Sequence, residues 1–226
     1  MNVNECYEII KEICAKNTAQ GYASPDDFVR NINLAQRSFA SYLIGQTQQY
    51  QAKRPIPIVA FGENERIRTS LAPLIYEEII PVNNVTGIGA FPYGFIQVDA
   101  MWGQYGYYNI RFTEQDRLSA NYRSVIDSPI SNNDNAVYLI RHEGFQFFPP
   151  TIGNVRCSYV QNPPSIVWGY TEVNGLPVYN PATSSDPVWD DVDILEVLVR
   201  CLDLFGVQMQ LGVVREYAMQ IKKGGQ

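Results

Sequence analysis

Residues 24–45 read SPDDFVRNINLAQRSFASYLIG and carry the clearest structural signal in the chain. The stretch opens with a serine, a proline and two aspartates, which satisfy or complement the free amides and the positive dipole of a helix start. Apolar side chains then recur at helical spacing along one face: Phe28, Ile32, Ala35, Phe39, Tyr42 and Leu43. The pattern predicts a long amphipathic helix that ends near Gly45.

Helical patterns also lie at both ends of the chain. From Asn4 the apolar positions Cys6, Ile10 and Cys14 recur at helical spacing until Gly21. Near the other end, Asp186-Pro187 repeats the cap-then-proline start and a broad apolar face follows it. A further helix is predicted from the apolar positions Val213, Val214, Tyr217, Ala218 and Ile221. Helices this apolar need cover on more than one side, so we expect the two ends of the chain to pack together.

Between these helices the periodicity changes. Short β-branched and aromatic runs, separated by Gly, Pro and Asn, predict strands of an antiparallel sheet, sandwich or small barrel. The runs are Ile56–Phe61, Leu74–Ile80, Gly94–Met101, Val137–Arg141, Phe145–Phe148, Val155–Val160 and Ile166–Tyr170. A short helix over Thr113–Ser124 is expected to interrupt them, and Asn174–Pro187 is predicted to be a loop.

The sequence therefore predicts an α+β fold with an inserted middle. Residues 1–54 and 186–226 are expected to form one module of N- and C-terminal helices. Residues 55–185 are expected to form a central antiparallel β-rich insertion that resembles a sandwich or a barrel.

The composition favours a protein that contacts other proteins. Charged residues make up only 18% of the chain, and 12% of the residues are aromatic, which fits either protein interfaces or an aromatic core. A net charge of −6 argues against tight binding of nucleic acid through its phosphates, although passive contact with DNA is compatible with it. No secretory signal and no membrane-spanning run is apparent, so we expect a soluble protein made in a cytoplasm, without a membrane partner.

No convergent set of catalytic residues is apparent in the sequence. The four cysteines form no CxxC pair and are expected to be small buried hydrophobes in a reducing compartment. The single histidine, His142, has no nucleophile motif around it, and a hydrolase that uses it remains an alternative interpretation. We therefore predict a protein that is not an enzyme and that has no catalytic residues, no cofactor and no metal site.

Two kinds of surface are candidates for assembly. Glycine-rich aromatic segments favour a contact surface slightly over a core: Phe91, Tyr93, Trp102, Tyr105, Tyr107 and Tyr108. Aspartates near the start of the helix predicted after Asp186 have no calcium-loop spacing. Those that the helix start does not use, Asp190, Asp191 and Asp193, are predicted to line the channel of an oligomer or to repel wrong partners.

Three stretches also resemble a known class of protein. They are the opening GYASPDDFVRNINLAQRSFASYLIGQ (residues 21–46), the middle from RLSANYRSVIDSPISNNDNAVYLIR (117–141) to FFPPTIGNVRCSYVQNPPSIVW (147–168), and the end DPVWDDVDILEVLVRCLDLFGVQMQ (186–210). Together they resemble the neck or ring proteins, also called head-to-tail connectors, of tailed bacteriophages, in particular crAss-like and related phages of Bacteroidetes.

The resemblance implies a structural virion protein, assembled in the host cytoplasm and located in the neck or tail region. Copies of the protein would form a ring around the DNA channel, below the portal and beside other neck and tail ring proteins, and would help to retain DNA until ejection. The alternatives within the structural class are a tail-tube protein, a baseplate protein or an assembly factor.

Overall fold

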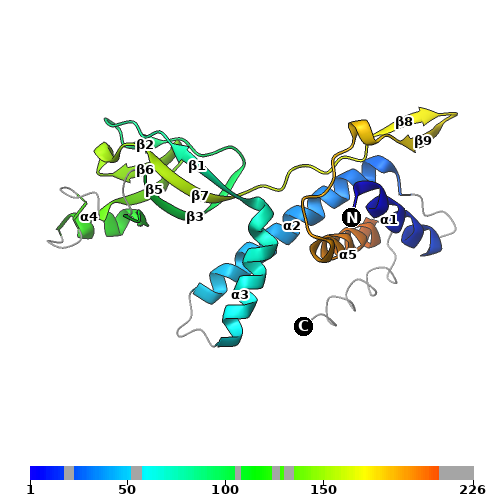
Figure 1. The fold of residues 1–226 in the computed structure, drawn as a ribbon, viewed down its shortest axis with the longest axis horizontal. Coiled ribbons are helices and arrows are strands. Elements are labelled where there is room, and N and C mark those ends of the chain that lie inside the picture. Colours follow the sequence, from blue (N-terminus) through cyan, green and yellow to red (C-terminus); the bar gives the residue numbers. More distant parts are fainter. Residues whose placement is uncertain (18–22, 52–57, 105–107, 124–127, 130–134, 209–226) are drawn as a thin grey trace. The chain divides into compact units, whose positions relative to one another are not determined.

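The chain folds as two compact units. A computed structural model describes residues 1–17, 23–51, 58–104, 108–123, 128–129 and 135–208. One unit joins Met1–Pro73 to Pro163–Gln226, and the other is the continuous segment Leu74–Asn162 (Figure 1). The predicted α+β class is confirmed, with helices from both ends of the chain in one unit and a β-rich segment inserted between them.

The helical unit is built around the two long helices α2 (Pro25–Gln51) and α5 (Asp191–Gln208), which pack on each other. Its elements are α1 (Val3–Asn17), α2 (Pro25–Gln51), α3 (Ile58–Leu71), the hairpin strands β8 (Tyr170–Val173) and β9 (Leu176–Tyr179), the short turn η4 (Pro181–Thr183) and α5 (Asp191–Gln208). Side chains from α1, α2 and α5 form its core: Cys6, Ile10, Phe28, Ile32, Phe39, Ile194, Leu198, Cys201 and Phe205. The predicted packing of N- and C-terminal helices is therefore present.

The start of α2 follows the prediction. The hydroxyl of Ser24 accepts a hydrogen bond from the amide of Asp27 at 3.1 Å and donates one to its carboxylate at 2.6 Å. This reciprocal cap satisfies an amide that the helix itself leaves without a partner. The helix continues past its predicted end near Gly45 to Gln51, so the polar residues 46–51 are still helical.

Two polar side chains of α2 bind the chain where it returns from the β-rich unit. The side chain of Asn33 donates to the carbonyl of Ile166 at 2.8 Å and accepts from the amide of the same residue at 3.0 Å. The fully buried Gln36 donates to the carbonyl of Pro164 at 2.9 Å and accepts from the indole N–H of Trp189 at 3.3 Å. We call these contacts the α2 clamp.

The prediction that the last helix begins at Asp186-Pro187 is wrong. Helix α5 begins at Asp191, and the carboxylate of Asp186 accepts a hydrogen bond from the amide of Val3, at the start of α1, at 2.8 Å. Trp189 is buried and lies edge-on to Phe39, with their ring centroids 5.0 Å apart. The chain before α5 therefore serves to cap α1 and to bury an indole.

The β-rich unit has two sheets. Sheet A has the order β1 (Ile75–Ile80), β7 (Val155–Gln161), β3 (Phe95–Gly103) and is antiparallel throughout. Sheet B has the order β2 (Ile88–Gly89), β6 (Gly144–Phe148), β5 (Val137–Arg141), β4 (Arg111–Phe112). The pair β4–β5 is parallel, which departs from the antiparallel pairing expected for every strand.

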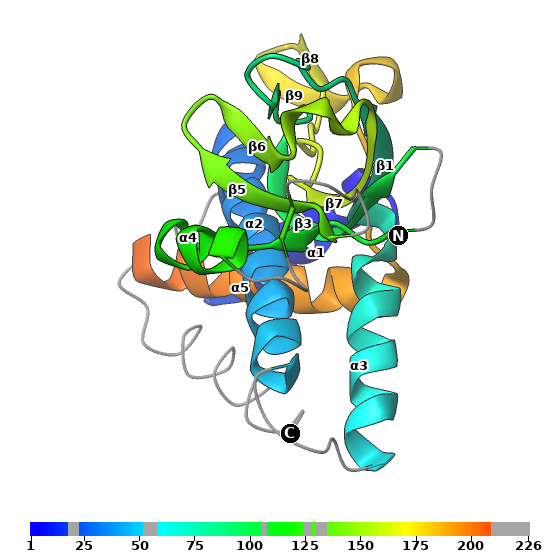
Figure 2. The same ribbon diagram turned by 90° about the vertical axis from the view of Figure 1, so that its left-hand side faces the viewer.

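The two sheets share one apolar core, as in a sandwich. Sheet A contributes Met101, Val155, Cys157 and Tyr159, and sheet B contributes Tyr138, Phe145 and Phe147. Helix α4 (Gln115–Arg123) covers the outer face of sheet B, because Leu118 and Tyr122 pack with Val137, Leu139 and Phe148. In Figure 2, β5, β6 and α4 lie toward the viewer within this unit.

The structure also corrects several predicted boundaries. Residues 58–61 of the predicted strand 56–61 belong to α3, which continues to Leu71, and residues 56 and 57 lie outside the described residues. The run 166–170 is mostly the returning segment held by the α2 clamp, and the predicted loop 174–187 contains β9. The compact β-rich unit is consequently Leu74–Asn162, shorter at both ends than residues 55–185.

We expect the α2 clamp to be a large contributor to stability. Replacing Gln36→Leu leaves the carbonyl of Pro164 and the indole N–H of Trp189 without this partner and should lower the free energy of unfolding by about 1–3 kcal/mol. Asn33→Ala should have an effect of similar size. Urea unfolding followed by circular dichroism measures both.

The matched control is Arg37→Ala, an exposed position on the same helix. It should change the free energy of unfolding by no more than about 0.5 kcal/mol. Equal stability of the Gln36→Leu variant and the Arg37→Ala variant would contradict the assignment.

Candidate functional site

The β8–β9 hairpin presents an unusual apolar face. Asn174 and Gly175 form its turn with φ values of 54° and 78°, the two positive values that a tight hairpin turn of this kind requires. Tyr170 and Tyr179 pair across the strands, and each ring lies 5.7 Å from that of Trp168, so one face of the hairpin rests on the helical unit.

The opposite face of the hairpin is exposed. Thr171 pairs with Val178, and Val173 pairs with Leu176, so these four side chains alternate with the tyrosines. Val173, Leu176 and Val178 are 50%, 68% and 48% exposed. We call these four side chains the hairpin face. A two-stranded hairpin with an uncovered apolar face has little stability of its own in water.

The first aromatic candidates lie before strand β3. The rings of Phe91 and Phe95 stack with their centroids 5.2 Å apart, and both meet Phe145 edge-on at 4.7 Å and 5.2 Å. Phe91 therefore closes the edge of the sandwich core and is only partly accessible. Tyr93 stands on the turn between them and is 88% exposed, which leaves it as the available contact residue of this segment.

The second aromatic candidates lie at the other end of β3. Trp102 is partly buried and pairs with Arg156 of β7, whereas Phe95 at the start of β3 pairs with Gln161. The ring of Tyr108 occupies the space where a side chain at Gly103 would be, so this glycine permits the packing. Tyr105 and Tyr107 lie outside the described residues. The candidate interface residues thus fall at opposite ends of one sheet, roughly 25 Å apart along the strand.

The candidate acidic residues have different surroundings. Asp191 contacts the amino group of Met1, and Asp193 accepts a hydrogen bond from the hydroxyl of Ser70 at 3.1 Å. Asp190 is exposed, and within the described part of the chain its carboxylate has neither a hydrogen bond nor an ion pair. Of these three carboxylates, that of Asp190 alone has no partner among the described residues. The channel-lining role of these residues stays a prediction.

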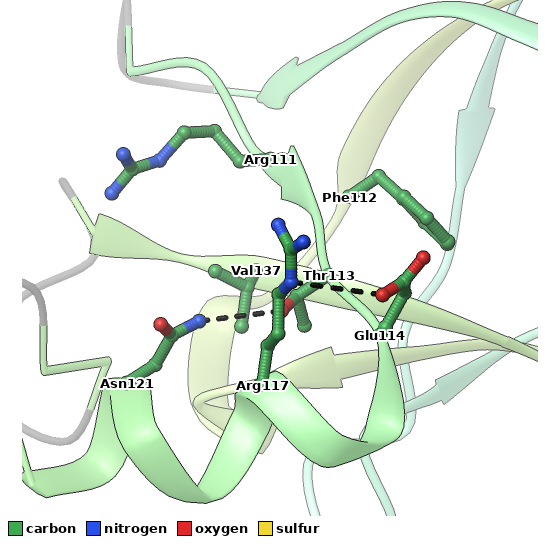
Figure 3. Close-up of a pocket in the computed structure, with 7 residues that line it drawn as sticks. All are labelled: Arg111, Phe112, Thr113, Glu114, Arg117, Asn121 and Val137. Atoms are coloured by element: carbon green, nitrogen blue, oxygen red, sulfur yellow. Dashed lines mark hydrogen bonds and ion pairs between the residues drawn. The ribbon is translucent and has the colours of Figure 1, made fainter.

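A hollow with two arginines lies on the β-rich unit, where β4 meets α4. It has a volume of about 240 Å³ and is lined by Arg111, Phe112, Thr113, Glu114, Arg117, Asn121 and Val137. In Figure 3 the side chain of Arg111 extends away from that of Arg117, the guanidinium of Arg117 lies beside Glu114, and the amide of Asn121 points toward Thr113. We call it the arginine hollow; no prediction from the sequence included it.

Two contacts join side chains of the arginine hollow to one another. The amide of Asn121 donates to the hydroxyl of the buried Thr113 at 3.3 Å, and the guanidinium of Arg117 lies 3.6 Å from the carboxylate of Glu114 (Figure 3). The side chain of Arg117 is 76% exposed, so solvent screens this ion pair strongly. Two arginines and one glutamate give the lining an excess of positive charge.

His142 lies on the exposed turn between β5 and β6. Among the described residues, no hydrogen bond or ion pair joins it to a serine, a cysteine or a carboxylate. All four cysteines are buried and free, and burial raises the pKa of Cys6 to about 11 and that of Cys157 to about 12. A raised pKa keeps a thiol protonated and weakly nucleophilic. The prediction that the protein is not an enzyme stays a prediction.

Within the described ranges, no group of three or more histidine, cysteine, aspartate or glutamate side chains is arranged to hold a metal ion. None of the helices in those ranges has both the length and the apolar character needed to cross a membrane.

Comparison with known proteins gives no assignment. No protein-family model matches the chain, and no curated protein sequence matches it significantly. The geometry of the described surfaces is therefore the basis for a functional proposal, together with the resemblance seen in the sequence.

The buried thiols predict a pH dependence of stability. The folded chain keeps the protons of Cys6 and Cys157 above the ordinary thiol pKa of 9.0, whereas the unfolded chain releases them. The free energy of unfolding should therefore be unaffected by these groups below pH 9 and should fall as the pH rises from 9 to about 11. The fall is at most about 1.4 kcal/mol per pH unit for each thiol.

Urea unfolding at pH 7.5, 9, 10 and 10.5 measures this slope, and the Cys6→Ala and Cys157→Ala variants are its controls. Each variant should show a smaller slope than the wild-type protein over the alkaline range. An identical slope in all three proteins would show that other groups cause the pH dependence.

Proposed function

We propose that this protein is a structural subunit that assembles with copies of itself into a ring around the DNA channel in the neck of a tailed phage. The observation that carries the proposal is the hairpin face, an exposed apolar surface on a two-stranded hairpin. The resemblance of the opening, middle and closing segments to phage neck proteins supplies the setting. The portal and other neck or tail ring proteins would be its neighbours.

The energetics of the hairpin favour a protein partner. The apolar side chains of the hairpin face, Val173, Leu176 and Val178, are removed from water only when another surface covers them. Each Å² of apolar surface buried in this way stabilises the complex by about 25 cal/mol. Repeated head-to-tail contacts between two unlike surfaces close into a ring. Tyr93 and Trp102, at opposite ends of one sheet, are additional unlike surfaces for such contacts.

The charge of the chain suits passive contact with DNA. A net charge of −6 gives no basis for counterion release on phosphate contact, which is the main source of affinity in DNA binding. A ring wall of this charge would let DNA pass without holding it tightly. The proposed role in DNA retention then depends on the assembled ring and its neighbours, and not on affinity of one subunit for DNA.

The hairpin face gives the test of the proposal. Leu176→Asp places a charge at the most exposed apolar residue of the hairpin face and should weaken self-association about tenfold or more, because an unpaired carboxylate would have to be buried. Mass photometry over a concentration series, with and without the purified portal ring, measures the oligomers. The wild-type protein should form oligomers or bind the portal ring.

The control is Glu172→Lys, which changes a charge on the opposite face of the same hairpin. It should assemble like the wild-type protein, and both variants should unfold at the wild-type temperature. A wild-type protein that stays monomeric and does not bind the portal ring would contradict the proposed function. Wild-type assembly by the Leu176→Asp variant would exclude the hairpin face as the contact.

A further inference from the structure

Strand β1 forms an open edge of sheet A. It pairs with β7 along all of its length, Ile75–Ile80, and lies on the side of β7 opposite to β3 (Figure 1). Within the described part of the chain, no backbone group outside β7 forms a hydrogen bond with the backbone of β1. In an antiparallel pair, alternate N–H and C=O groups of each strand point away from the neighbouring strand. The outer side of β1 therefore presents a row of backbone donors and acceptors to a further strand.

The other edge of sheet A is less suited to further pairing. Strand β3 has register irregularities against β7 at Phe95–Gln97 and Val98–Ala100, and such bulges twist an edge away from a new strand. The end of β3 is also covered, because the amide of Ile110 donates to the carbonyl of Met101 at 2.9 Å. β1 pairs with β7 without a register shift, and none of its residues is a lysine or a proline, which commonly protect an edge.

Side chains of β1 are exposed on both faces of the sheet. Tyr76 and Ile79 point to opposite faces and are 44% and 42% exposed. The two residues between them, Glu77 and Glu78, are exposed as well. A strand added beside β1 would therefore pack its side chains against an aromatic ring on one face and an aliphatic side chain on the other.

The two glutamates determine the charge of this edge. The carboxylate of Glu77 lies 3.2 Å from the guanidinium of Arg156, and the carboxylate of Glu78 accepts a hydrogen bond from the hydroxyl of Tyr159 at 3.4 Å. Both partners belong to β7, on the side of β1 away from the open edge. Two carboxylates beside one guanidinium leave a net negative charge. Basic residues on an added strand would complement it, whereas acidic residues would be repelled.

The same charges disfavour β1 of a second copy as the added strand. When two β1 strands pair antiparallel over their full length, Glu77 of each copy faces Glu78 of the other. A shift by one residue brings two copies of Glu77, or two copies of Glu78, face to face. Like charges directly opposite each other destabilise a strand pair. The open edge therefore suits a strand of a different protein.

We propose that β1 is a docking edge for an extended segment of another protein, which adds a fourth strand to sheet A. The segment carries lysine or arginine opposite Glu77 and Glu78 and aliphatic residues opposite Tyr76 and Ile79. Main-chain hydrogen bonds hold the segment, and the facing charges select it. This contact goes beyond the proposed ring, because it joins the protein to a different partner and does not use the hairpin face.

A synthetic peptide tests the proposal. The fluorescein-labelled peptide Thr-Val-Lys-Lys-Val-Thr has a palindromic sequence, so its lysines face the two glutamates in either strand direction. Fluorescence anisotropy with increasing full-length protein gives its Kd. The peptide Thr-Val-Glu-Glu-Val-Thr should bind about tenfold more weakly or worse, because its carboxylates would face Glu77 and Glu78.

Exchanging the charges of the protein tests which residues select the peptide. The Glu77→Lys/Glu78→Lys protein should reverse the preference and bind the Glu-Glu peptide about tenfold more tightly than the Lys-Lys peptide. The matched control is Glu143→Lys, an exposed acid on the turn between β5 and β6 of the same unit. It should keep the preference of the wild-type protein. Thermal unfolding of each variant verifies that it is folded.

Two further measurements test whether the backbone of β1 forms the contact. An excess of the Lys-Lys peptide should slow amide hydrogen exchange within residues 75–80, because amides that point outward gain a hydrogen-bond acceptor. A Lys-Lys peptide that is methylated on every backbone nitrogen cannot donate to β1. Its affinity should fall about tenfold or more.

Each outcome decides for or against the docking edge. Failure of the Lys-Lys peptide to bind at protein concentrations up to about 1 mM overturns the inference. Equal affinity for the Glu-Glu peptide or for the methylated peptide also overturns it. Loss of self-association in the Glu77→Lys/Glu78→Lys protein would instead assign β1 to a contact between copies.

The Leu176→Asp protein separates this inference from the proposed function. It should bind the Lys-Lys peptide as tightly as the wild-type protein does, because the hairpin face takes no part in the contact. A wild-type protein that stays monomeric but binds the peptide would contradict the ring and support the docking edge. A wild-type protein that assembles but does not bind the peptide would do the reverse.

Discussion

The fold depends on the α2 clamp, in which Asn33 and Gln36 bind the returning chain. Asn33 pairs with both the amide and the carbonyl of Ile166, as a neighbouring strand would. A buried polar group that loses its partner costs free energy. The two hydrogen bonds of Asn33 therefore fix the position of Ile166 along α2, whereas apolar burial alone would allow several positions. The chain enters the helical unit for the second time at Pro163, and the α2 clamp binds it at Pro164 and Ile166.

The same clamp determines how the chain enters α5. Gln36 accepts from the indole of Trp189, which lies just before that helix, and Asp186 three residues earlier caps the start of α1. Four aspartates between residues 186 and 193 therefore have four different environments, although they look like one acidic group in the sequence. Only Asp190 is left with an exposed carboxylate that has no partner among the described residues. The acidic group predicted from the sequence is therefore not a uniform patch, because three of its four aspartates contact other residues.

Local signals predicted much of the fold. The cap at Ser24 and the bounds of β5 and β7 follow from residues next to one another in the sequence, so periodicity and turn chemistry located them. Asn174-Gly175 between two β-branched stretches is a strong local hairpin signal that the loop interpretation overlooked. The role of Asp186 was beyond local reasoning, because its contact joins it to Val3, 183 residues away. The arginine hollow is lined mainly by residues 111–121, but these residues form no recognisable motif in the sequence.

The structure also decides between two interpretations of the aromatic composition. Many of the described aromatic side chains, such as Phe28, Phe145, Phe147, Trp168 and Trp189, are buried and form the cores of the two units. Aromatic content by itself therefore says little about assembly in this chain. The case for a partner rests on side chains that the composition does not single out: the aliphatic residues of the hairpin face. Their exposure is the feature that folding of the single chain does not explain, because an uncovered apolar ribbon gains stability only when another surface buries it.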